Sequence, residues 1–425
     1  MQIPRFTRGC CSNPNEDRRS LPFLLGGASA IRRQWEWPGA AIGQAVAALG
    51  HEVVVLSQAP GISKLEKSQI GTLEVWLSPR DKKRDFFTGL RDKWAKQTYR
   101  HRKVYTDAYA LRDFLAQRGP FDVLWAQTEE PDGLVAAIAA QQGVKLPPVV
   151  TQIQALRYKF EKGEPIFNEK PALRISFQHS DRILANSELV AKNLHHYTGP
   201  DFPVEKLQAK VDIVFPNLGR QFLQAAEEVD SSPDPGPNRV LFFGALNEKK
   251  GALVFMEALS KSEAAKSRAT FAIIGDFTEK NPEFTARWNE AVAAARTWLP
   301  PERLELIGKV SPFEVMRQIK LARVVVLPSF FDEFSRALVE TLSLGRPVIS
   351  TTHVGTAPLV KEHECGVIIA PHDPEALAKA IDAALSPTAV YLENAKRIGH
   401  RLLHEFSPET IARQLIRHFS EVAKR

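Results

Sequence analysis

The sequence has few cysteines and lacks any long hydrophobic run. Cys10, Cys11 and Cys365 are its only cysteines, too few and too scattered for a disulfide framework, which favours a reducing cytoplasm. No run approaches the ~18 apolar residues that a membrane helix needs. Residues 1–20 carry positive charge but no apolar segment, so they do not resemble a secretory signal. We expect a cytoplasmic protein with a disordered leader over residues 1–20.

The composition is that of a large folded protein with more than one core. Of the 425 residues, 44% are hydrophobic, which is enough for two substantial domains. A polar stretch punctuated by proline and glycine, residues 221–238, has the composition of a linker. The predicted units are an N-terminal domain (21–220), a C-terminal domain (239–400), and a final helix over 401–425 that packs back toward the first domain.

Short apolar runs alternate with helical patterns on both sides of the linker. Examples are Val53–Leu56 and Val123–Ala126 in the first half, and Phe271–Ile274 and Val324–Leu327 in the second. Strands that alternate with helices are typical of parallel sheets. The fold class we predict is α/β, with two Rossmann-like, doubly wound domains that face each other across a cleft.

One stretch, Val324–Pro347, combines a buried strand, a loop and a helix. The strand stops at Pro328-Ser329 and the helical pattern ends at Gly345. Ligands of open parallel sheets bind beyond the carboxyl ends of the strands, where a helix start presents free N–H groups to an anion. Asp332 and Glu340 bracket this helix start. A ligand that carries both a diphosphate and hydroxyl groups, such as a nucleotide sugar, fits this combination.

The spacing of these two acids resembles a known family signature. Asp332, seven residues and then Glu340, with Pro328-Ser329 before and Gly345-Arg346-Pro347-Val348 after, is similar to the acid-x7-acid motif of family 4 retaining glycosyltransferases, which have the GT-B fold. The resemblance runs from about Leu21 to the C-terminus and is divergent. A plain strand-to-helix connection with a solvated carboxylate at each end is the alternative for this stretch alone.

The resemblance implies a donor site in the C-terminal half. Lys250, on a loop that begins at Gly244, would clamp the donor diphosphate, and Ala245 stands where the family has an arginine. Arg336 could replace that lost cation. The resemblance further implies contact with the nucleotide base for Lys309 and Val310, with the diphosphate for Ser335 and Arg336, with the ribose for Glu340, and with the transferred sugar for Asp332. Phe334, beside this helix start, is a further expected donor-binding residue.

The resemblance also implies an acceptor side in the N-terminal half. Gly27 and Gly39 occupy the places of glycines that let the backbone approach a ligand. Gln127 stands where many family members have a histidine close to the reacting carbon. A neutral amide can hold a sugar hydroxyl but cannot act as a titrating base. We therefore expect Asp332, Gln127 and Lys250 to carry the reaction, in a variant arrangement.

The expected activity is transfer of a sugar from a nucleotide-diphosphate donor, a UDP-sugar by the resemblance, to a glycan or lipid-linked acceptor. No cofactor beyond this co-substrate is expected. No metal is expected either, because the sequence contains no Asp-x-Asp signature. A catalytically inactive nucleotide-sugar-binding or scaffold protein is the alternative, and an epimerase on the same fold is a further rival.

Residues 80–103 concentrate positive charge. Ten lysines and arginines alternate there with Phe86, Phe87, Leu90, Trp94 and Tyr99. Such a segment can lie on an anionic membrane, which would place the protein peripherally on the inner membrane face. A solvated face over a small apolar seam is the equal alternative. Nucleic acid is not an expected partner, because no recognised binding module accompanies the charge.

Overall fold

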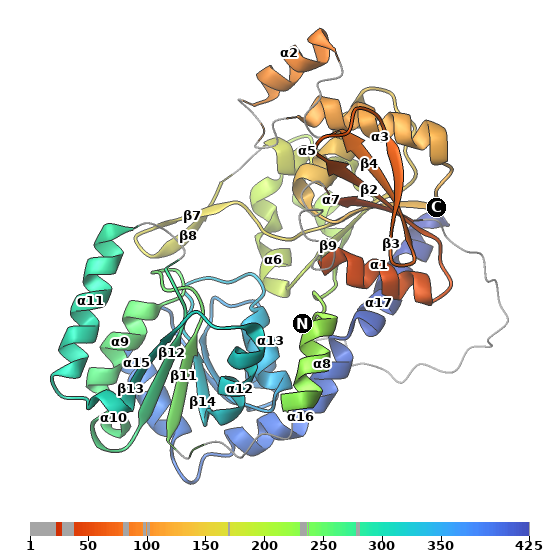
Figure 1. Ribbon diagram of the computed structural model, residues 1–425. Helices are drawn as coiled ribbons and strands as arrows, with labels where there is room; N and C mark the ends of the chain where they lie inside the picture. Colours follow the sequence, from red (N-terminus) through yellow and green to blue (C-terminus); the bar gives the residue numbers. More distant parts are fainter. Residues whose placement is uncertain are drawn as a thin grey trace.

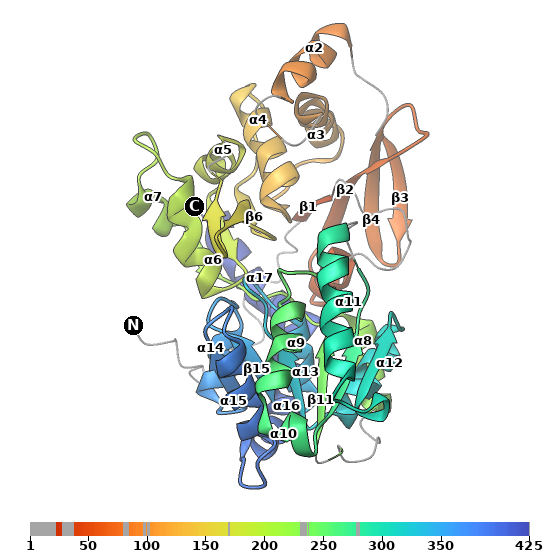
Figure 2. The same ribbon diagram turned by 90° about the vertical axis from the view of Figure 1, so that its left-hand side faces the viewer.

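The computed structural model describes residues 23–27, 38–79, 85–96, 99, 103–168, 171–229, 236, 238–277 and 281–424, without side chains for 23–27 and 38–40. The leader 1–20 and the middle of the linker lie outside these residues. The described chain forms two α/β domains, one above the other (Figures 1 and 2). This confirms the predicted fold class.

The N-terminal domain is built on an eight-stranded sheet in the order β10-β9-β6-β5-β1-β2-β4-β3. Its strands are parallel except for β3, which pairs antiparallel with β4. The strands are β1 (Phe23–Gly27), β2 (Val53–Ala59), β3 (Glu66–Ile70), β4 (Leu73–Pro79), β5 (Val123–Ala126), β6 (Val149–Gln152), β9 (Arg182–Ala185) and β10 (Val211–Ile213). The helical elements are α1 (Pro38–Ala48), α2 (Phe86–Ala95), α3 (Val104–Arg118), η1 (Glu129–Gly133), α4 (Leu134–Gln141), α5 (Pro171–His179), α6 (Glu188–Asn193), η2 (Leu194–Tyr197) and α7 (Val204–Gln208).

The C-terminal domain has a six-stranded parallel sheet in the order β13-β12-β11-β14-β15-β16. These strands are β11 (Arg239–Phe243), β12 (Thr270–Ile274), β13 (Leu304–Gly308), β14 (Val324–Leu327), β15 (Val348–Thr351) and β16 (Gly366–Ile369). The helical elements of this domain are α8 (Arg220–Val229), α9 (Ala252–Lys261), α10 (Glu263–Ser267), α11 (Pro282–Arg296), η3 (Pro301–Arg303), α12 (Pro312–Leu321), α13 (Arg336–Ser343), α14 (Ala357–Glu362), α15 (Pro374–Ala384) and α16 (Tyr391–Glu405). The last helix of the chain is α17 (Pro408–Ala423).

Segments from each half cross to the other. The range predicted as a linker includes most of α8, which packs against α12 of the C-terminal domain. The boundary expected at residue 400 falls inside α16, which lies on α13. The chain then crosses to the N-terminal domain, where α17 packs on α1 and the Phe419 ring lies 5.5 Å from that of Trp125.

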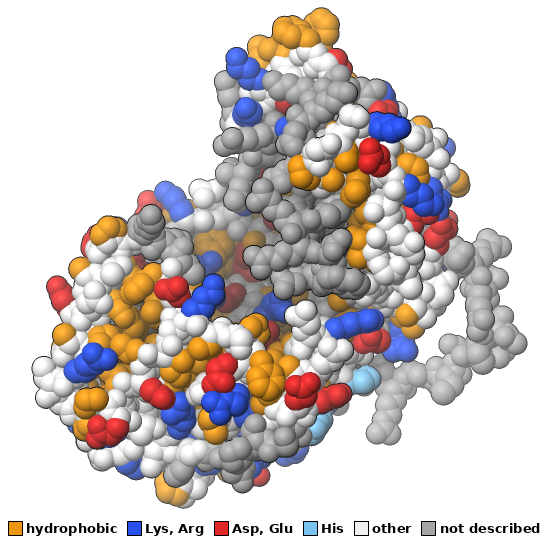
Figure 3. Space-filling view, viewed as in Figure 1, with side chains coloured by type: hydrophobic (Ala, Val, Ile, Leu, Met, Phe, Trp, Pro, Cys, Tyr) orange, Lys and Arg blue, Asp and Glu red, His pale blue; other side chains and the backbone are white. Residues whose placement is uncertain are grey.

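A two-stranded hairpin, β7 (Tyr158–Glu161) and β8 (Glu164–Phe167), also leaves the N-terminal domain and reaches the C-terminal one (Figure 1). At its turn the Gly163 carbonyl lies 3.0 Å from His372 Nε2. At its base the Tyr158 ring lies 4.7 Å from that of Phe331. The hairpin and α17 thus link the two domains, and a hollow lies between the domains in Figure 3.

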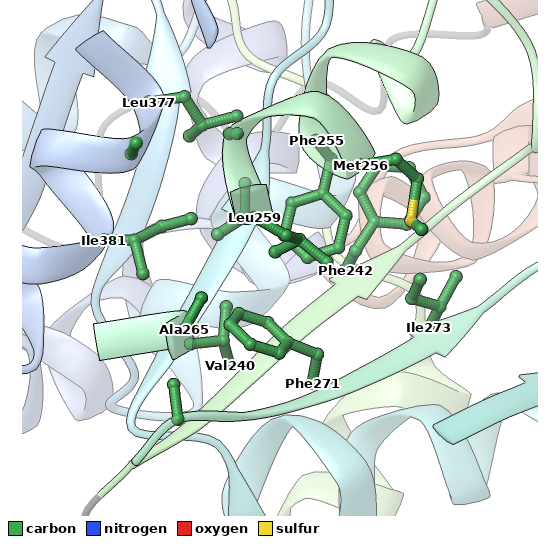
Figure 4. Packing of buried hydrophobic residues seen from close by; sticks show 14 of the residues in the cluster. Val240, Phe242, Phe255, Met256, Leu259, Ala265, Phe271, Ile273, Leu377 and Ile381 are labelled. Atoms are coloured by element: carbon green, nitrogen blue, oxygen red, sulfur yellow. The ribbon is translucent and has the colours of Figure 1, made fainter. Parts of the chain in front are cut away.

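Buried apolar side chains cover both faces of the C-terminal sheet, as they must when strands alternate with helices. On one face β11 and β12 pack against α9 and α15, with Phe242 and Phe255 stacked 5.3 Å apart (Figure 4). The central strands β14 and β15 are buried along their whole length, and they consist of apolar residues except for Ser350 and Thr351. This packing fixes the strand ends from which the site loops emerge.

Candidate functional site

A cavity of about 230 Å³ lies between the domains, at the carboxyl ends of strands from both sheets. Gln127, Gln152 and Asn186 lie at or just beyond the ends of β5, β6 and β9, whereas Asp332 follows β14. The polar lining is Gln127, Gln152, Gln154, Asn186, Asn217, Asp332, Glu333 and Arg336. The apolar lining is Ile42, Trp125, Phe215, Pro216, Phe334, Ile411 and Leu415.

The N-terminal wall of the cavity is made of neutral amides. Gln154 Nε2 donates to the Gln127 carbonyl at 3.0 Å, and Asn186 Nδ2 donates to the Gln154 carbonyl at 3.2 Å. In each bond an amide side chain donates to a backbone carbonyl, and the two bonds join the ends of three strands. An amide side chain offers both donors and an acceptor, as a sugar hydroxyl does. This wall, which includes Gln127, is therefore suited to hydroxyl groups.

The loop before α13 is held in place from several sides. The Asp332 N–H donates to the His353 carbonyl at 3.1 Å, and the Gly355 N–H donates to the Asp332 carbonyl at 2.8 Å. Ser335 is the N-cap of α13, and its Oγ accepts from the Leu338 N–H at 3.4 Å. The predicted helix start thus exists at Ser335, with Asp332 and Arg336 at the cavity.

Lys250 and Asp332, which are 82 residues apart in the chain, form an ion pair with Nζ 2.6 Å from Oδ2. The lysine side chain is 33% exposed. Gly251, which follows it, has φ +72°, and a Cβ there would lie 2.1 Å from the Pro328 carbonyl oxygen. Only glycine allows the loop before α9 to approach the end of β14 so closely, and this approach brings the lysine to the aspartate.

Arg336 and Glu340 face each other on the first turns of α13. Arg336 Nη2 lies 3.8 Å from Glu340 Oε1. Burial raises the pKa of the Glu340 carboxyl, and the positive charge of Arg336 opposes that rise. The guanidinium is half-exposed, whereas the carboxylate is mostly covered. A cation is therefore available at this helix start, where the sequence suggested a replacement for the missing arginine.

The other predicted donor residues follow neighbouring strands of the same sheet. Gly244 comes directly after β11, and Lys309 and Val310 come directly after β13. None of the three lines the cavity between the domains. Lys309 is exposed, and Val310 packs at the edge of the core. They are thus placed along one edge with Lys250, as a ligand longer than a sugar ring would require.

The predicted acceptor-side glycines lie on the other sheet. Gly27 is the last residue of β1 and pairs with Ser57 of β2, and Gly39 is in the first turn of α1. The segment between them lies outside the described residues. Ile42, one turn beyond Gly39 in α1, lines the cavity.

Two buried acids that were not predicted meet at the domain boundary. Glu333 Oε1 accepts from the Leu156 N–H at 2.5 Å, and Glu129 Oε2 accepts from the Gln154 N–H at 2.9 Å. Burial raises the pKa of each carboxyl to about 7, and the charge of Glu129 raises that of Glu333 further. The Glu333 carbonyl also accepts from Ser187 Oγ at 2.6 Å. Glu333 thus joins the donor-side loop to the N-terminal domain.

Sequence signals for these missed residues exist in part. Gln152, Gln154 and Asn186 stand at or beyond strand ends, and the rule that drew attention to Asp332 could have named them. Glu333 is adjacent to the signature acid, but no local pattern shows that it is buried against another domain. Within the described ranges no three His, Cys, Asp or Glu side chains are grouped to hold a metal ion, and no helix is long and apolar enough to cross a bilayer.

Comparison with known families gives two matches. Residues 40–208 match the family described as Glycosyltransferase Family 4, and residues 237–386 match that described as Glycosyl transferases group 1. Glycogen synthase of Mycobacterium tuberculosis (strain ATCC 25618 / H37Rv) is 26% identical over 180 residues, 42% of each chain. This chain spans about half the length of the curated relatives that it matches first.

Solved structures share the fold over nearly the whole chain. A glycosyltransferase from Rickettsia africae ESF-5 has a TM-score of 0.67 at 16% identity and covers 96% of this chain and 100% of its own. Anabaena Alr3699/HepE, solved in complex with UDP and glucose, has a TM-score of 0.60 at 16% identity, with 94% and 99% covered. At this identity the likeness concerns the fold.

Proposed function

The chain belongs to the family 4 glycosyltransferases of the GT-B fold, as a divergent member, and from this premise we propose that it transfers a sugar from a nucleotide-diphosphate donor to a hydroxyl acceptor. The donor lies along the C-terminal sheet edge, with its sugar in the cavity. A UDP-sugar is the donor that we propose, and a glycan or lipid-linked molecule is the acceptor. The reaction retains the configuration at the transferred carbon and uses no metal.

The contrast between the two cavity walls carries this proposal. Gln127, Gln154 and Asn186 form a neutral wall on one side, while Asp332 and Arg336 are charged groups on the other. Hydroxyl groups pair well with amides, and diphosphates pair well with cations and helix N-termini. A nucleotide sugar and its acceptor together present both kinds of group.

On the donor side, Lys250 and the start of α13 bind the diphosphate. An ammonium group has three N–H donors, so Lys250 can keep its bond to Asp332 while it binds a phosphate oxygen. Arg336 supplies the second cation beside the N–H groups that follow Ser335. Glu340 accepts from the ribose hydroxyls, and the backbone at Lys309 and Val310 meets the base.

In the reaction the bond between the sugar carbon and the diphosphate oxygen breaks, and a bond from that carbon to the acceptor oxygen forms on the same face. The acceptor proton passes to the leaving phosphate oxygen. Lys250 and Arg336 stabilise the negative charge that develops there, while Asp332 and Gln127 orient sugar hydroxyls. The neutral amide of Gln127 positions groups and transfers no proton.

The test is release of the free nucleoside diphosphate from a panel of UDP-, GDP- and ADP-sugars, with and without added acceptors. Product release from one donor, lost in Asp332→Asn and retained in Asp373→Asn, supports the proposal. Asp373 is a suitable control because it caps α15 and does not line the cavity, and because asparagine is an equally good N-cap residue. Absence of release from every donor, with the fold intact, contradicts it.

One observation favours a second candidate, a nucleotide-sugar-binding protein without transferase activity. Ala245 replaces a cation, and the remaining Lys250 is already paired with Asp332 at 2.6 Å. Calorimetric binding of UDP without turnover of any donor would identify this case.

A further inference from the structure

Helix α2 exposes its large apolar side chains and buries its small and polar ones. The exposed fractions of Phe86, Phe87 and Trp94 are 78%, 75% and 73%, and that of Leu90 is 43%. The buried side of the helix consists of Thr88, Gly89, Asp92 and Ala95. In a surface helix of a folded protein the large apolar side chains normally face the core and the polar ones face solvent. The orientation of α2 therefore has to come from a specific contact.

That contact is the carboxylate of Asp92, which caps the neighbouring helix. Asp92 Oδ1 accepts from the Tyr105 N–H at 2.8 Å and Oδ2 from Thr106 Oγ1 at 2.5 Å, at the start of α3. Carboxylates are stabilised at helix N-termini. At the start of α2, Asp85 accepts from the Thr88 N–H at 2.8 Å. Because Asp92 is fixed to α3, the opposite face of α2 must point outward.

The outward face forms one continuous apolar stripe, composed of Phe86, Phe87, Leu90 and Trp94. At 3.6 residues per turn these four fall within about a third of the helix circumference. Arg91 borders the stripe on one side, where its guanidinium lies 3.2 Å from the Tyr109 hydroxyl of α3, and Lys93 borders it on the other. Figure 3 shows hydrophobic atoms at the tip of the molecule, over α2.

The helix also stands apart from the rest of the fold. It projects from the N-terminal domain at the end remote from the C-terminal domain (Figures 1 and 2). A stripe in that position can meet a flat surface without obstruction from the other domain. The sequence adds Lys82, Lys83 and Arg84 directly before α2, and Arg100, Arg102 and Lys103 shortly after it.

We propose that α2 docks the protein on an anionic lipid membrane, with the apolar stripe in the interface and with Arg91 and Lys93, which border the stripe, at the headgroups. Apolar side chains flanked by lysine and arginine are the composition of helices that lie in a bilayer interface. A protein partner with a matching apolar groove would not require the positive charge. This inference is independent of the proposed glycosyl transfer, because α2 lies outside the cavity.

Flotation of the full-length protein with vesicles tests the proposal. The vesicles are phosphatidylcholine alone or an equal mixture with phosphatidylglycerol. We expect partitioning onto the anionic vesicles, reduced by at least about a hundredfold in Phe86→Ser/Phe87→Ser/Leu90→Ser/Trp94→Ser. In Arg91→Gln/Lys93→Gln/Lys96→Gln we expect a loss of about fivefold per residue. The circular dichroism spectrum and the Tm stay unchanged in both variants and show that they are folded.

Two exposed aromatic residues of the C-terminal domain supply the matched control. Trp298 and Phe313 are 38% and 44% exposed, and Trp298→Ser/Phe313→Ser should bind vesicles as the unmodified protein does. Equal binding by the apolar-stripe variant, or no binding of the unmodified protein to anionic vesicles, overturns the proposal. So does a self-association that sedimentation detects and the stripe substitutions abolish, because the stripe would then be an interface between copies.

Discussion

The two walls of the interdomain cavity differ in charge although both are built from strand ends of parallel sheets. The N-terminal wall presents amides at the ends of β5, β6 and β9, whereas the C-terminal wall presents Asp332, which is paired with Lys250, and Arg336. Neutral side chains make up the first wall, whereas the second combines charged side chains with the helix start at Ser335. Each wall is thus suited to a different part of one transfer reaction, and substitutions on either side should have separable effects.

The largest effect should come from removing Lys250, the cation that is paired with Asp332 of the charged wall. We expect Lys250→Ala to lower kcat/KM by about 100- to 1,000-fold, because it loses charge-assisted contacts to both phosphate and Asp332. Nucleotide-release kinetics measure this. Lys266→Ala, on the surface of α10, is the control and should change little. A Lys250→Ala enzyme within threefold of the unmodified one would show that the charged wall does not bind the donor.

Arg336 should contribute less, because it is half-exposed and shares its charge with Glu340. We expect Arg336→Ala to weaken UDP binding by about 10- to 100-fold and Arg336→Lys to recover part of the loss. Calorimetry with UDP measures both. Arg317→Ala, which removes an exposed ion pair on α12, should leave UDP affinity unchanged. Unchanged affinity in Arg336→Ala would rule out its role as the second cation.

The neutral wall should respond in acceptor use, with little change in donor binding. We expect Gln127→Ala to lower kcat/KM for the acceptor by about tenfold, as for loss of one or two neutral hydrogen bonds, while UDP affinity stays the same. Steady-state kinetics with varied acceptor, combined with calorimetry, separate the two quantities. Gln69→Ala, on exposed strand β3, is the control. If Gln127→Ala weakened UDP binding instead, the division between the walls would be wrong.

The smallest effect that we expect is a pH-dependent change in Tm, which comes from Glu333 and Glu129 at the domain boundary. Burial raises the pKa of Glu333 and of Glu129 to about 7, so the folded protein holds their protons more tightly than the unfolded chain does. Their favourable contribution is complete below the ordinary carboxyl pKa of about 4.5 and is lost as the pH rises through about 7. We expect the Tm to fall by a few °C between pH 5 and pH 8 from this source.

Glu333→Gln isolates that contribution, because an amide can still interact with the Leu156 N–H and carries no charge. We expect its Tm at pH 8 to exceed that of the unmodified protein by a few °C, corresponding to about 1–3 kcal/mol. Differential scanning calorimetry at several pH values measures it. Glu393→Gln, an exposed surface carboxyl, should show no such gain. A lower Tm for Glu333→Gln at pH 8 would mean that the charged form stabilises the boundary.

The two walls also differ in how far the sequence could predict them. Asp332, Ser335 and Glu340 were named because they lie at the start of a helix that follows a buried strand. Lys250 was named because its loop resembles that of the family. The ion pair between Lys250 and Asp332 could not be predicted, because these residues are 82 positions apart and meet only through the close approach of Gly251 to Pro328. For the amide wall, only Gln127 was named.

The features that the sequence could not predict depend on contacts between segments that are distant in the chain. The burial of Glu333 depends on Leu156, 177 residues away. The sequence showed that residues 80–103 are basic and amphipathic, but it could not show which face of α2 is buried. That choice depends on the Asp92 carboxylate at the start of α3.

The β7–β8 hairpin has a consequence for how the molecule can open. Any separation of the domains along that edge has to part Gly163 from His372 and Tyr158 from Phe331. Phe331 directly precedes Asp332, so a swing that lifts the hairpin also unpacks the backbone beside the signature acid. Opening of the domains for substrate entry is in this way coupled to the position of Asp332.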